Sequence, residues 1–382
     1  MREHSDIVIV GGGPVGAALA LALADSDWQV QVLEARVDLQ RAAYKRTLAL
    51  SYGSRLILQR LGVWSALSDV TAISDIHISQ RGSVGMSRLH AAEEGLPALG
   101  YVVDYAELDS ALHAALRNSA VEVVTAAKVT ATDGAAGYAR IQAELAGVSR
   151  QFTTRLAVIA DGGASSTPRV TRPYAQQALL ASVRTELAHN GCAYERFTAQ
   201  GPVALLPQGA GFALVWTGAP EQVQALLGLP EADFLQALHV HFGDRVGRFL
   251  SVDGRTHFPL NLSYVRNTVS PHQVMIGNAA HILHPVAGQG FNLGLRDVWE
   301  LAECVRGCRR DELGGMAMLK RFQAQRRLDS SASIFFTDLL VRLFSNPNPL
   351  LQHGRSLGLL ALQQLPPLKH FVARRMIFGA RG

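Results

Sequence analysis

Three glycines near the amino terminus, Gly11, Gly13 and Gly16, are spaced as in a turn that binds a pyrophosphate. Glycine lets the backbone turn tightly, approach the phosphates and pack the following helix against the preceding strand. Glu34 follows about twenty residues later, where an acidic side chain can accept the ribose hydroxyls of an adenosine. This spacing indicates a dinucleotide site, and the same turn contains Pro14 and Val15.

A second segment with cofactor-binding character lies far along the chain, at residues 277–297. Gly288 and Gly290 permit close approach, and the backbone N–H groups near Phe291 and Asn292 open a predicted helix, where they can stabilise negative charge on a cofactor ring. Pro285 precedes them and can lie beside that ring. A plain NAD-linked dehydrogenase would leave this segment unexplained, so the two segments together favour a flavin.

The elements that must position these residues can be read from apolar periodicity. Residues 6–10 form a β-branched strand, residues 14–24 an alanine- and leucine-rich helix, and residues 30–33 the next strand. The start of that helix supplies free N–H groups to the phosphates. An ordinary glycine turn in an α/β sheet is the structural alternative.

The rest of the chain continues the α/β alternation up to Pro173 and then shifts to strand material, with a helical interruption near residues 234–242. Strong helices are expected at residues 292–305 and 316–343. We therefore predict a discontinuous cofactor domain, an inserted β-sheet substrate domain and a carboxy-terminal helical region. Their ranges are residues 1–78, 100–172 and 265–325 for the first, 79–99 and 173–264 for the second, and 326–382 for the third.

Composition is that of a globular enzyme. The 36 lysines and arginines against 31 aspartates and glutamates give a net charge of +5, too small and scattered to indicate nucleic-acid binding. The cysteines, Cys192, Cys304 and Cys308, are too few for a disulfide framework. No secretory signal and no apolar stretch long enough to span a bilayer is expected. We therefore expect a cytoplasmic protein.

The last 32 residues, 351–382, contain basic residues and no acidic one, interleaved with leucine and phenylalanine. Two interpretations stay open. One is a basic amphipathic surface that touches an anionic membrane, on the inner membrane face. The other is a pair of solvated helices packed on the domain.

Three motifs carry a resemblance to a known family that covers nearly the whole chain. They are the turn ending in Glu34, the Asp-Gly motif in residues 160–165, and the segment 277–297. Together they resemble the class A flavoprotein monooxygenases, of the para-hydroxybenzoate hydroxylase architecture. Further segments resemble the ubiquinone-biosynthesis branch of that family: residues 47–51, 61–64, 78–82, 194–198, 201–202, 206–207 and 288–297.

The resemblance implies a Rossmann-like α/β fold that binds FAD, with NAD(P)H as electron donor and dioxygen as co-substrate. In such enzymes the reduced flavin forms a C4a-hydroperoxide that delivers OH to an electron-rich ring. The implied substrate is a polyprenylated phenol of ubiquinone synthesis, a pathway in which the protein can join a complex. A hydrophobic substrate would account for a tail that faces the membrane.

The same resemblance assigns the cofactor contacts. Asn278 stands where the family more often has an aspartate that holds the ribityl chain, and an amide can still donate and accept hydrogen bonds. The arginine that often follows Asp161 is displaced to Arg169, with Pro168 in its place. The predicted FAD contacts are Gly11, Gly13, Pro14, Val15, Gly16, Glu34, Arg46, Asp161, Asn278, Pro285, Gly288, Gly290, Phe291 and Asn292.

No catalytic base is singled out by the sequence. Glu195, Arg196 and Phe197, with Pro285, are the predicted neighbours of the substrate ring. His281 and His284 lack a third ligand nearby, so no metal is expected. The alternatives that stay open are another flavin enzyme, such as a halogenase or a prenyl reductase, another ring hydroxylase of the same pathway, and a non-catalytic flavin-stabilised subunit.

Overall fold

In the computed structural model, which describes residues 2–38, 46–165, 167–284, 288–344 and 349–381, the first apolar run forms β1 (His4–Val10). It pairs in parallel with β2 (Val30–Leu33) and with β11 (Val148–Ile159). The order of this first sheet is β17–β18–β11–β1–β2–β8, and β9 and β10 extend it from β11. The remaining strands are β8 (Glu122–Val124), β9 (Ala127–Ala135), β10 (Tyr138–Leu145), β17 (Val269–Ser270) and β18 (Gln273–Met275).

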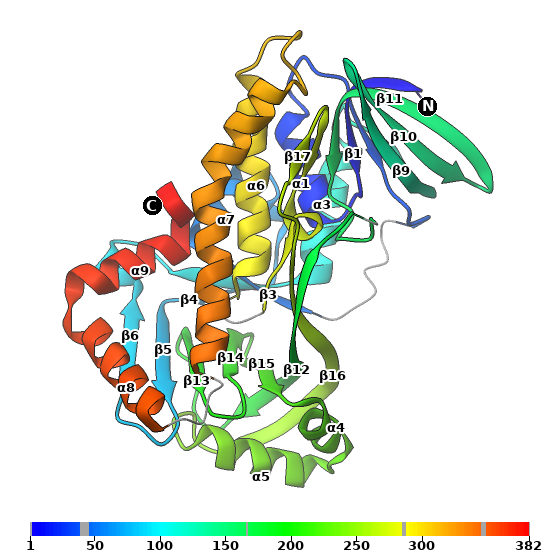
Figure 1. The fold of residues 1–382 in the computed structure, drawn as a ribbon. Coiled ribbons are helices and arrows are strands. Elements are labelled where there is room, and N and C mark those ends of the chain that lie inside the picture. Colours follow the sequence, from blue (N-terminus) through cyan, green and yellow to red (C-terminus); the bar gives the residue numbers. More distant parts are fainter. Residues whose placement is uncertain (1, 39–45, 166, 285–287, 345–348, 382) are drawn as a thin grey trace.

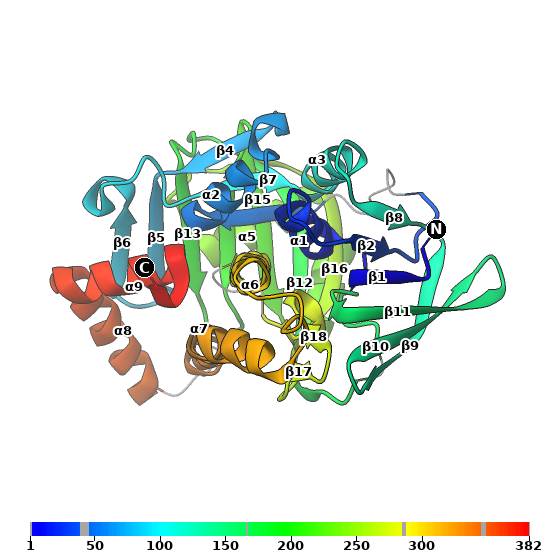
Figure 2. The ribbon, with the colours of Figure 1, turned by 90° about the horizontal axis from the view of Figure 1, so that it is seen from above.

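Strand β1 is apolar at successive positions because both of its faces are covered. Ile7 and Ile9 pack with the helices α1, α3 and α6, whereas Val8 and Val10 pack with the β9–β10–β11 layer. Figure 2 shows α1 and α6 lying over the same side of this sheet. The helices are α1 (Pro14–Leu23), α3 (Tyr105–Arg117) and α6 (Gln289–Arg306).

The second sheet is long and mostly antiparallel, with the order β19–β16–β12–β15–β14–β13–β5–β6. Its two longest strands, β12 (Val170–Thr185) and β16 (Phe249–Tyr264), pair along their length (Figure 1). Residues 75–90 join this sheet because β5 pairs in parallel with β13. The other strands are β5 (Asp75–Gln80), β6 (Met86–His90), β13 (Cys192–Phe197), β14 (Val203–Gln208), β15 (Gly211–Gly218) and β19 (His281–Ile282).

One face of the second sheet is covered by two helices, where the sequence predicted one. They are α4 (Pro220–Gly228) and α5 (Glu231–Phe242), and they enclose a core around Trp216 and Phe234. Pro220 occupies the first turn of α4, and Glu221 follows it. Proline and an acidic residue are favoured at a helix start, so a signal for the missed helix was present.

A small third sheet, β3–β7–β4, and the carboxy-terminal helices complete the fold. Its strands are β3 (Thr47–Ser51), β4 (Val70–Ile73) and β7 (Gly100–Asp104). The remaining helices are α2 (Tyr52–Arg60), α7 (Met316–Phe344), α8 (Pro349–Gln364) and α9 (Pro366–Phe378), with short 3-10 turns η1 (Trp64–Ala66), η2 (Ala91–Glu94), η3 (Gly277–Ala279) and η5 (Gly379–Arg381). The predicted α/β fold with an inserted sheet and terminal helices is confirmed.

Helix α9 is fastened to the body of the protein. Ala373 and Ile377 are buried against the region of β6 and η2, and the ammonium of Lys369 lies 2.7 Å from the Glu93 carboxylate. On α8, Arg355 is buried and donates to the Leu343 carbonyl. Two of the basic residues in the tail thus serve packing. Among the described helices, none has the length and apolarity needed to cross a bilayer.

Candidate active site

The glycine turn after β1 has the shape of a phosphate cradle. Gly11 has φ +100°, and a Cβ there would lie 2.6 Å from the Ala160 carbonyl oxygen. A Cβ on Gly16 would lie 2.0 Å from the Gly11 carbonyl oxygen, so this glycine lets α1 pack on the turn. A Cβ on Gly13 would meet no atom within 4 Å.

Helix α1 begins beside that open space without a side-chain cap and without an acidic residue in its first turn. Pro14 stands in the first turn, where its missing N–H costs nothing. The remaining N–H groups at the helix start, together with the helix dipole, therefore suit an anionic group such as a pyrophosphate.

Glu34 is buried at the end of β2 and is held on both carboxylate oxygens. Its Oε2 accepts from the Gly12 N–H at 2.6 Å, and its Oε1 accepts from the Arg36 N–H at 2.8 Å. The Arg36 guanidinium also contacts Asp109 at 3.2 Å and the Gly12 carbonyl at 3.3 Å. Burial tends to lower the pKa of Arg36, but the carboxylates of Glu34 and Asp109 outweigh this and raise it above its usual value.

This network below the turn includes residues that the sequence did not single out. The His113 Nε2 lies 2.7 Å from the Gly12 carbonyl oxygen, and Asp109 and His113 are both buried on one face of α3. Their spacing of four residues, with Arg36 two residues after Glu34, was the available signal. The network fixes the glycine turn from below.

The Asp-Gly loop after β11 is closed by its own aspartate. Asp161 accepts from the Gly163 N–H at 2.9 Å and from the Ser165 N–H at 2.7 Å. The displaced Arg169 donates to the carbonyls of Ala279, at 2.6 Å, and Asn278, at 3.0 Å. Arg169 therefore joins the Asp-Gly loop to the second motif.

The start of α6 is fixed by Asn292. Its side-chain oxygen accepts from the Ser51 N–H at 2.8 Å and from the Ser54 hydroxyl at 2.7 Å. Its amide donates to the carbonyls of Gly288, at 2.7 Å, and Ala49. Gly288 has φ +60° at the helix N-cap, and no acidic residue lies in the first turn. The helix start is thus a second place where backbone N–H groups can stabilise an anion.

His281 belongs to a buried charge network. Its Nε2 lies 2.9 Å from an Asp297 carboxylate oxygen, which also accepts from the Gly277 N–H at 3.0 Å. Arg326 donates to the other oxygen of Asp297 at 2.7 Å. Burial tends to raise the pKa of Asp297, but Arg326 and His281 outweigh this and hold it well below its usual range. Within the described residues, no group of three or more His, Cys, Asp or Glu side chains could hold a metal.

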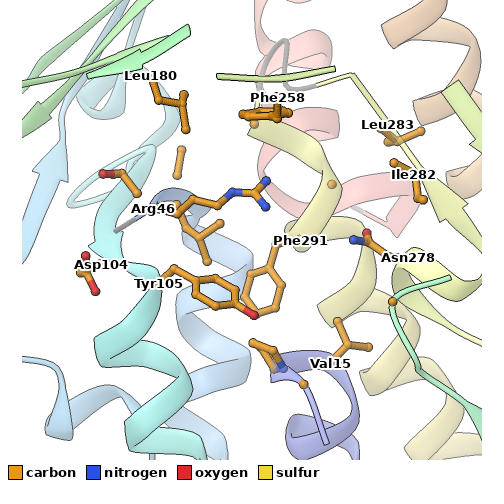
Figure 3. Close-up of a pocket in the computed structure, with 18 of the residues that line it drawn as sticks. Val15, Arg46, Asp104, Tyr105, Leu180, Phe258, Asn278, Ile282, Leu283 and Phe291 are labelled. Carbon is orange, nitrogen blue, oxygen red and sulfur yellow. The ribbon is translucent and has the colours of Figure 1, made fainter. Parts of the chain in front are cut away.

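These elements surround one cavity of about 1940 Å³, larger than the ~300–1,000 Å³ usual for small-molecule pockets. Figure 3 shows Val15, Phe291 and Asn278 on one side of it and Leu180 and Phe258 across from them. The Arg46 guanidinium projects between these walls, 5.7 Å from the centre of the Phe258 ring. The predicted FAD contacts that line it are Gly11, Gly13, Pro14, Val15, Glu34, Arg46, Asp161, Asn278, Gly288, Gly290 and Phe291.

Other predicted site residues are placed elsewhere. Gly16 and Asn292 lie behind the cavity wall, in the packing roles given above. Glu195, Arg196 and Phe197 do not line the cavity. Pro285 lies outside the described residues, so its predicted place beside the ring stays a prediction.

The three residues of β13 point to different faces of the second sheet. Tyr194 packs on Phe242 of α5, which places Arg196 on the α5 side and Glu195 and Phe197 on the other. Burial raises the pKa of Glu195 to about 7. Phe197 packs with Leu359 of α8. Strand alternation therefore separates Arg196 from its two neighbours.

Part of the far wall of the cavity is apolar, beside polar residues such as Ser182 and Asn261. It includes Leu180, Leu206, Phe258 and Leu260 of the second sheet, with Ile282 and Leu283 beside it. His284 also lines this part and packs edge-on against Tyr174, with ring centroids 5.3 Å apart. Burial lowers the pKa of His284 to about 4, so its imidazole is neutral at physiological pH.

Comparison with known proteins identifies the family. A family model described as an FAD binding domain matches residues 4–328. Ubiquinone hydroxylase UbiL of Rhodospirillum rubrum is 35% identical to this chain, over 97% of this chain and 89% of its own length. The chain belongs to the FAD-dependent ubiquinone-biosynthesis hydroxylases.

Two further similarities agree with this family. The 3-demethoxyubiquinol 3-hydroxylase of Escherichia coli K12 is 31% identical to this chain. The similarity covers 96% of this chain and 97% of the Escherichia coli enzyme. The crystal structure of p-nitrophenol 4-monooxygenase PnpA from Pseudomonas putida DLL-E4 superposes with a TM-score of 0.78, at 16% identity and over the whole of both chains. The predicted class A monooxygenase fold and the predicted enzyme class are confirmed.

The residues of this hydroxylase fit FAD. Gly13 and Gly290 leave open space where a Cβ would intrude into the cavity. Two helix starts free of acidic residues, those of α1 and α6, lie at the same cavity. A pyrophosphate and an electron-rich ring edge are the two anionic parts of a reduced flavin dinucleotide, and each has a helix start available.

Proposed function

We propose that this hydroxylase oxidises the aromatic ring of a polyprenylated phenol or quinol in ubiquinone biosynthesis. The observation that carries the proposal is the composition of the large cavity described above. One side of the cavity carries the two helix starts that suit FAD. The opposite side includes an apolar patch of leucine, isoleucine and phenylalanine side chains. An apolar wall that faces the reactive end of the cofactor suits the hydrophobic ring of a prenylated substrate and excludes water.

In this proposal each motif holds one part of FAD. The start of α1 binds the pyrophosphate and Glu34 the adenosine ribose, once its oxygens exchange partners with the ligand. Asn278 holds the ribityl chain, and the N–H groups at the start of α6 face the pyrimidine edge of the flavin. FAD, when bound, supplies the activation of dioxygen. Leu180 and Phe258 orient the substrate ring and keep water away from it.

The electron donor in this proposal is NAD(P)H. Consumption of NADH and NADPH, measured with and without substrate, tests this choice. The finer substrate assignment that the sequence supports is 2-octaprenyl-6-methoxyphenol, as in the hydroxylase UbiH. Another ring position of the same pathway is the competing assignment, because one relative is named as a 3-hydroxylase of a demethoxyubiquinol.

Product analysis tests the function. The purified, FAD-loaded protein is given a panel of prenylphenols and prenylquinols, and the products are located by mass spectrometry and NMR. Hydroxylation of 2-octaprenyl-6-methoxyphenol alone supports the finer assignment, and hydroxylation of a different ring position replaces it. A protein that binds flavin and oxidises NAD(P)H but hydroxylates no member of the panel contradicts the proposed substrate class.

We also propose that the hydroxylase collects its substrate at the cytoplasmic face of a membrane. Four large apolar side chains of the last helical region, Leu357, Leu365, Leu368 and Phe371, are between 43% and 67% exposed. Exposed apolar side chains of this size gain about 1.5–3 kcal/mol each when fully buried in an apolar medium. Assembly with other enzymes of the pathway stays a prediction from the family resemblance.

Point substitutions test the membrane contact better than deletion of residues 351–382, because α9 buries Ala373 and Ile377 in the body of the protein. The double variant Leu357→Ser, Phe371→Ser is compared with the wild type in flotation with vesicles. We expect weaker vesicle binding with an unchanged flavin spectrum. Equal flotation of the two proteins would remove the membrane role from these side chains.

A further inference from the structure

Three arginines gather on the face of the second sheet that carries α5. Arg196 is on β13, Arg81 follows β5, and Arg245 follows α5. Strands β13 and β5 pair in parallel with Arg196 opposite Ser79, and the Arg81 N–H donates to the Phe197 carbonyl at 2.8 Å. Figure 1 shows α5 at the end of the molecule opposite to the amino terminus. We call these three residues the arginine cluster.

The charge of the arginine cluster is not compensated by the protein. Among the described residues, no ion pair joins any of the three guanidinium groups to a carboxylate. Asp244, the carboxylate next to Arg245 in sequence, contacts His239 at 3.0 Å instead. The residues outside the described ranges include no aspartate or glutamate. Burial and the charges of Arg245 and Arg81 lower the pKa of Arg196 to about 10.

Two buried histidines lie behind the arginine cluster. His77 and His241 are 9% and 6% exposed, and each has a buried ring nitrogen without a hydrogen-bond partner, Nδ1 of His77 and Nε2 of His241. The Nδ1 of His241 is 3.5 Å from the Arg81 guanidinium. The Nε atom of Arg196 is also buried without a partner. Arg81 and Arg245 are exposed and Arg196 is partly buried, so a soluble group can reach the cluster. Unsatisfied buried polar atoms are costly, and a bound group with acceptor oxygens could satisfy the three atoms beside the arginine cluster.

An anion with several acceptor oxygens has the chemistry to supply these hydrogen-bond partners. Burial, together with nearby arginines, lowers the pKa of both His77 and His241 to about 4, so both rings are neutral at physiological pH and can donate one hydrogen bond. Guanidinium groups match phosphate oxygens in paired hydrogen bonds, and such charge-assisted bonds are about twice as strong as neutral ones.

We propose that Arg81, Arg196 and Arg245, backed by His77 and His241, bind a phosphate group. The site is separate from the active site, because none of the three arginines lines the large cavity. The phosphate can come from a soluble phosphate ester or from a phospholipid headgroup. Val84, in the same turn as Arg81, is 82% exposed, which is compatible with insertion beside a headgroup. Only the lipid source depends on the membrane contact proposed above.

Soluble phosphate tests the site without any membrane. The FAD-loaded protein is titrated with inorganic phosphate and with glycerol phosphate by calorimetry, at constant ionic strength, and its thermal unfolding is followed in phosphate and in chloride. The variants are Arg196→Gln and Arg245→Gln. Arg248→Gln is the matched control, because Arg248 is near Arg245 in sequence, is exposed, and pairs with Glu186 at 3.4 Å. We expect each cluster variant to weaken binding at least tenfold and to lose the phosphate-dependent rise in Tm.

The same proteins are then floated with vesicles of phosphatidylglycerol and of phosphatidylcholine. Arginine-dependent binding to phosphatidylglycerol, with no response to soluble phosphate, identifies the headgroup as the source. A response to soluble phosphate alone identifies a free ester. The proposal is overturned if neither probe binds, or if Arg248→Gln weakens binding as much as the cluster variants. If the double variant Leu357→Ser, Phe371→Ser loses vesicle binding, the titrations with soluble phosphate should still be unchanged. The membrane proposal and the phosphate-site proposal can therefore fail independently.

In chloride, the variants also report on the fold. Because the cluster arginines repel one another, Arg196→Gln is expected to unfold at the same or a higher temperature than the wild type. A fall in Tm in both media, together with unchanged phosphate affinity, would show that Arg196 serves packing and would contradict the site.

Discussion

The guanidinium of Arg169 donates to the backbone carbonyl of Asn278 at 3.0 Å, across 109 residues of sequence. A second nitrogen of Arg169 donates to the neighbouring carbonyl of Ala279. This contact holds the Asp-Gly loop against the turn that presents Asn278 to the cavity, so the two motifs reach the flavin site as one unit.

Removal of this contact should weaken FAD binding. In Arg169→Leu, the carbonyls of the buried Ala279 and the exposed Asn278 lose a charged donor. We expect a cost of about 1–3 kcal/mol, or roughly a tenfold to hundredfold rise in the FAD dissociation constant. Quenching of flavin fluorescence measures it. Arg172→Leu is the control, because Arg172 is half-exposed and lies 3.6 Å from Asp338. Equal affinity of both variants for FAD would contradict the coupling of the two motifs.

A methyl group at Gly13 should separate cofactor binding from folding. Its Cβ meets no protein atom, so Gly13→Ala is expected to fold like the wild type, while the methyl group enters the pyrophosphate site and expels the cofactor. Gly228→Ala, at another glycine with open space, should keep full flavin content. Absorbance of purified protein at flavin wavelengths, with circular dichroism for the fold, measures both. A yellow Gly13→Ala protein would place the pyrophosphate elsewhere.

The buried network around Asp329, in the middle of α7, should be needed for stability. Asp329 accepts from Arg326 at 2.6 Å, from Arg296 at 2.8 Å and from the Ala380 N–H at 3.1 Å. Asp329→Asn leaves buried arginines under-compensated, and we expect a loss of about 3–5 kcal/mol in the free energy of unfolding. Urea denaturation measures it.

Asp311→Asn is the control for this prediction, since Asp311 is exposed beside Arg309. An exposed pair of this kind contributes about 0–1 kcal/mol. Comparable urea midpoints for the two variants would show that the network contributes little to the stability of the native state.

The pH dependence of stability should change in Glu195→Gln. Burial raises the pKa of this carboxyl group from 4.5 to about 7, so the folded state binds its proton more tightly than the unfolded state. The resulting stabilisation is complete below pH 4.5 and is lost as the pH rises through 7. Glutamine cannot lose a proton, so the variant should gain about 1–3 kcal/mol relative to wild type between pH 5 and pH 8.

Urea midpoints at a series of pH values measure this difference. If Glu195 reaches solvent in the native state, the difference in free energy of unfolding between variant and wild type should not change with pH. That outcome would contradict the inferred burial. Glu186→Gln, at an exposed carboxylate paired with Arg248, is the control and should follow the wild type across the same range.

Several contacts could not be predicted because they join distant parts of the chain. The sequence indicated the backbone N–H groups near Asn292 as an FAD contact, and this stays a prediction. It gave no sign that the Asn292 side chain bonds with Ser51 and Ser54, about 240 residues away in sequence. Arg36, Asp109 and His113 support the glycine turn without belonging to a recognised motif. Each side chain had several possible partners, and only the packing of α3 and α6 on β1 selected among them.

The sequence alone determined the features that depend on local backbone chemistry. The turn at Gly11 and Gly16 needs conformations or close contacts that only glycine tolerates, and periodicity located α6 and α7 to within a few residues. The tertiary structure decided which surfaces meet. It set Leu180 and Phe258 of the inserted sheet across from Phe291, and it turned Arg196 away from Glu195 to join Arg81 and Arg245. Strand register and sheet packing, which are fixed by contacts over long sequence distances, govern these placements.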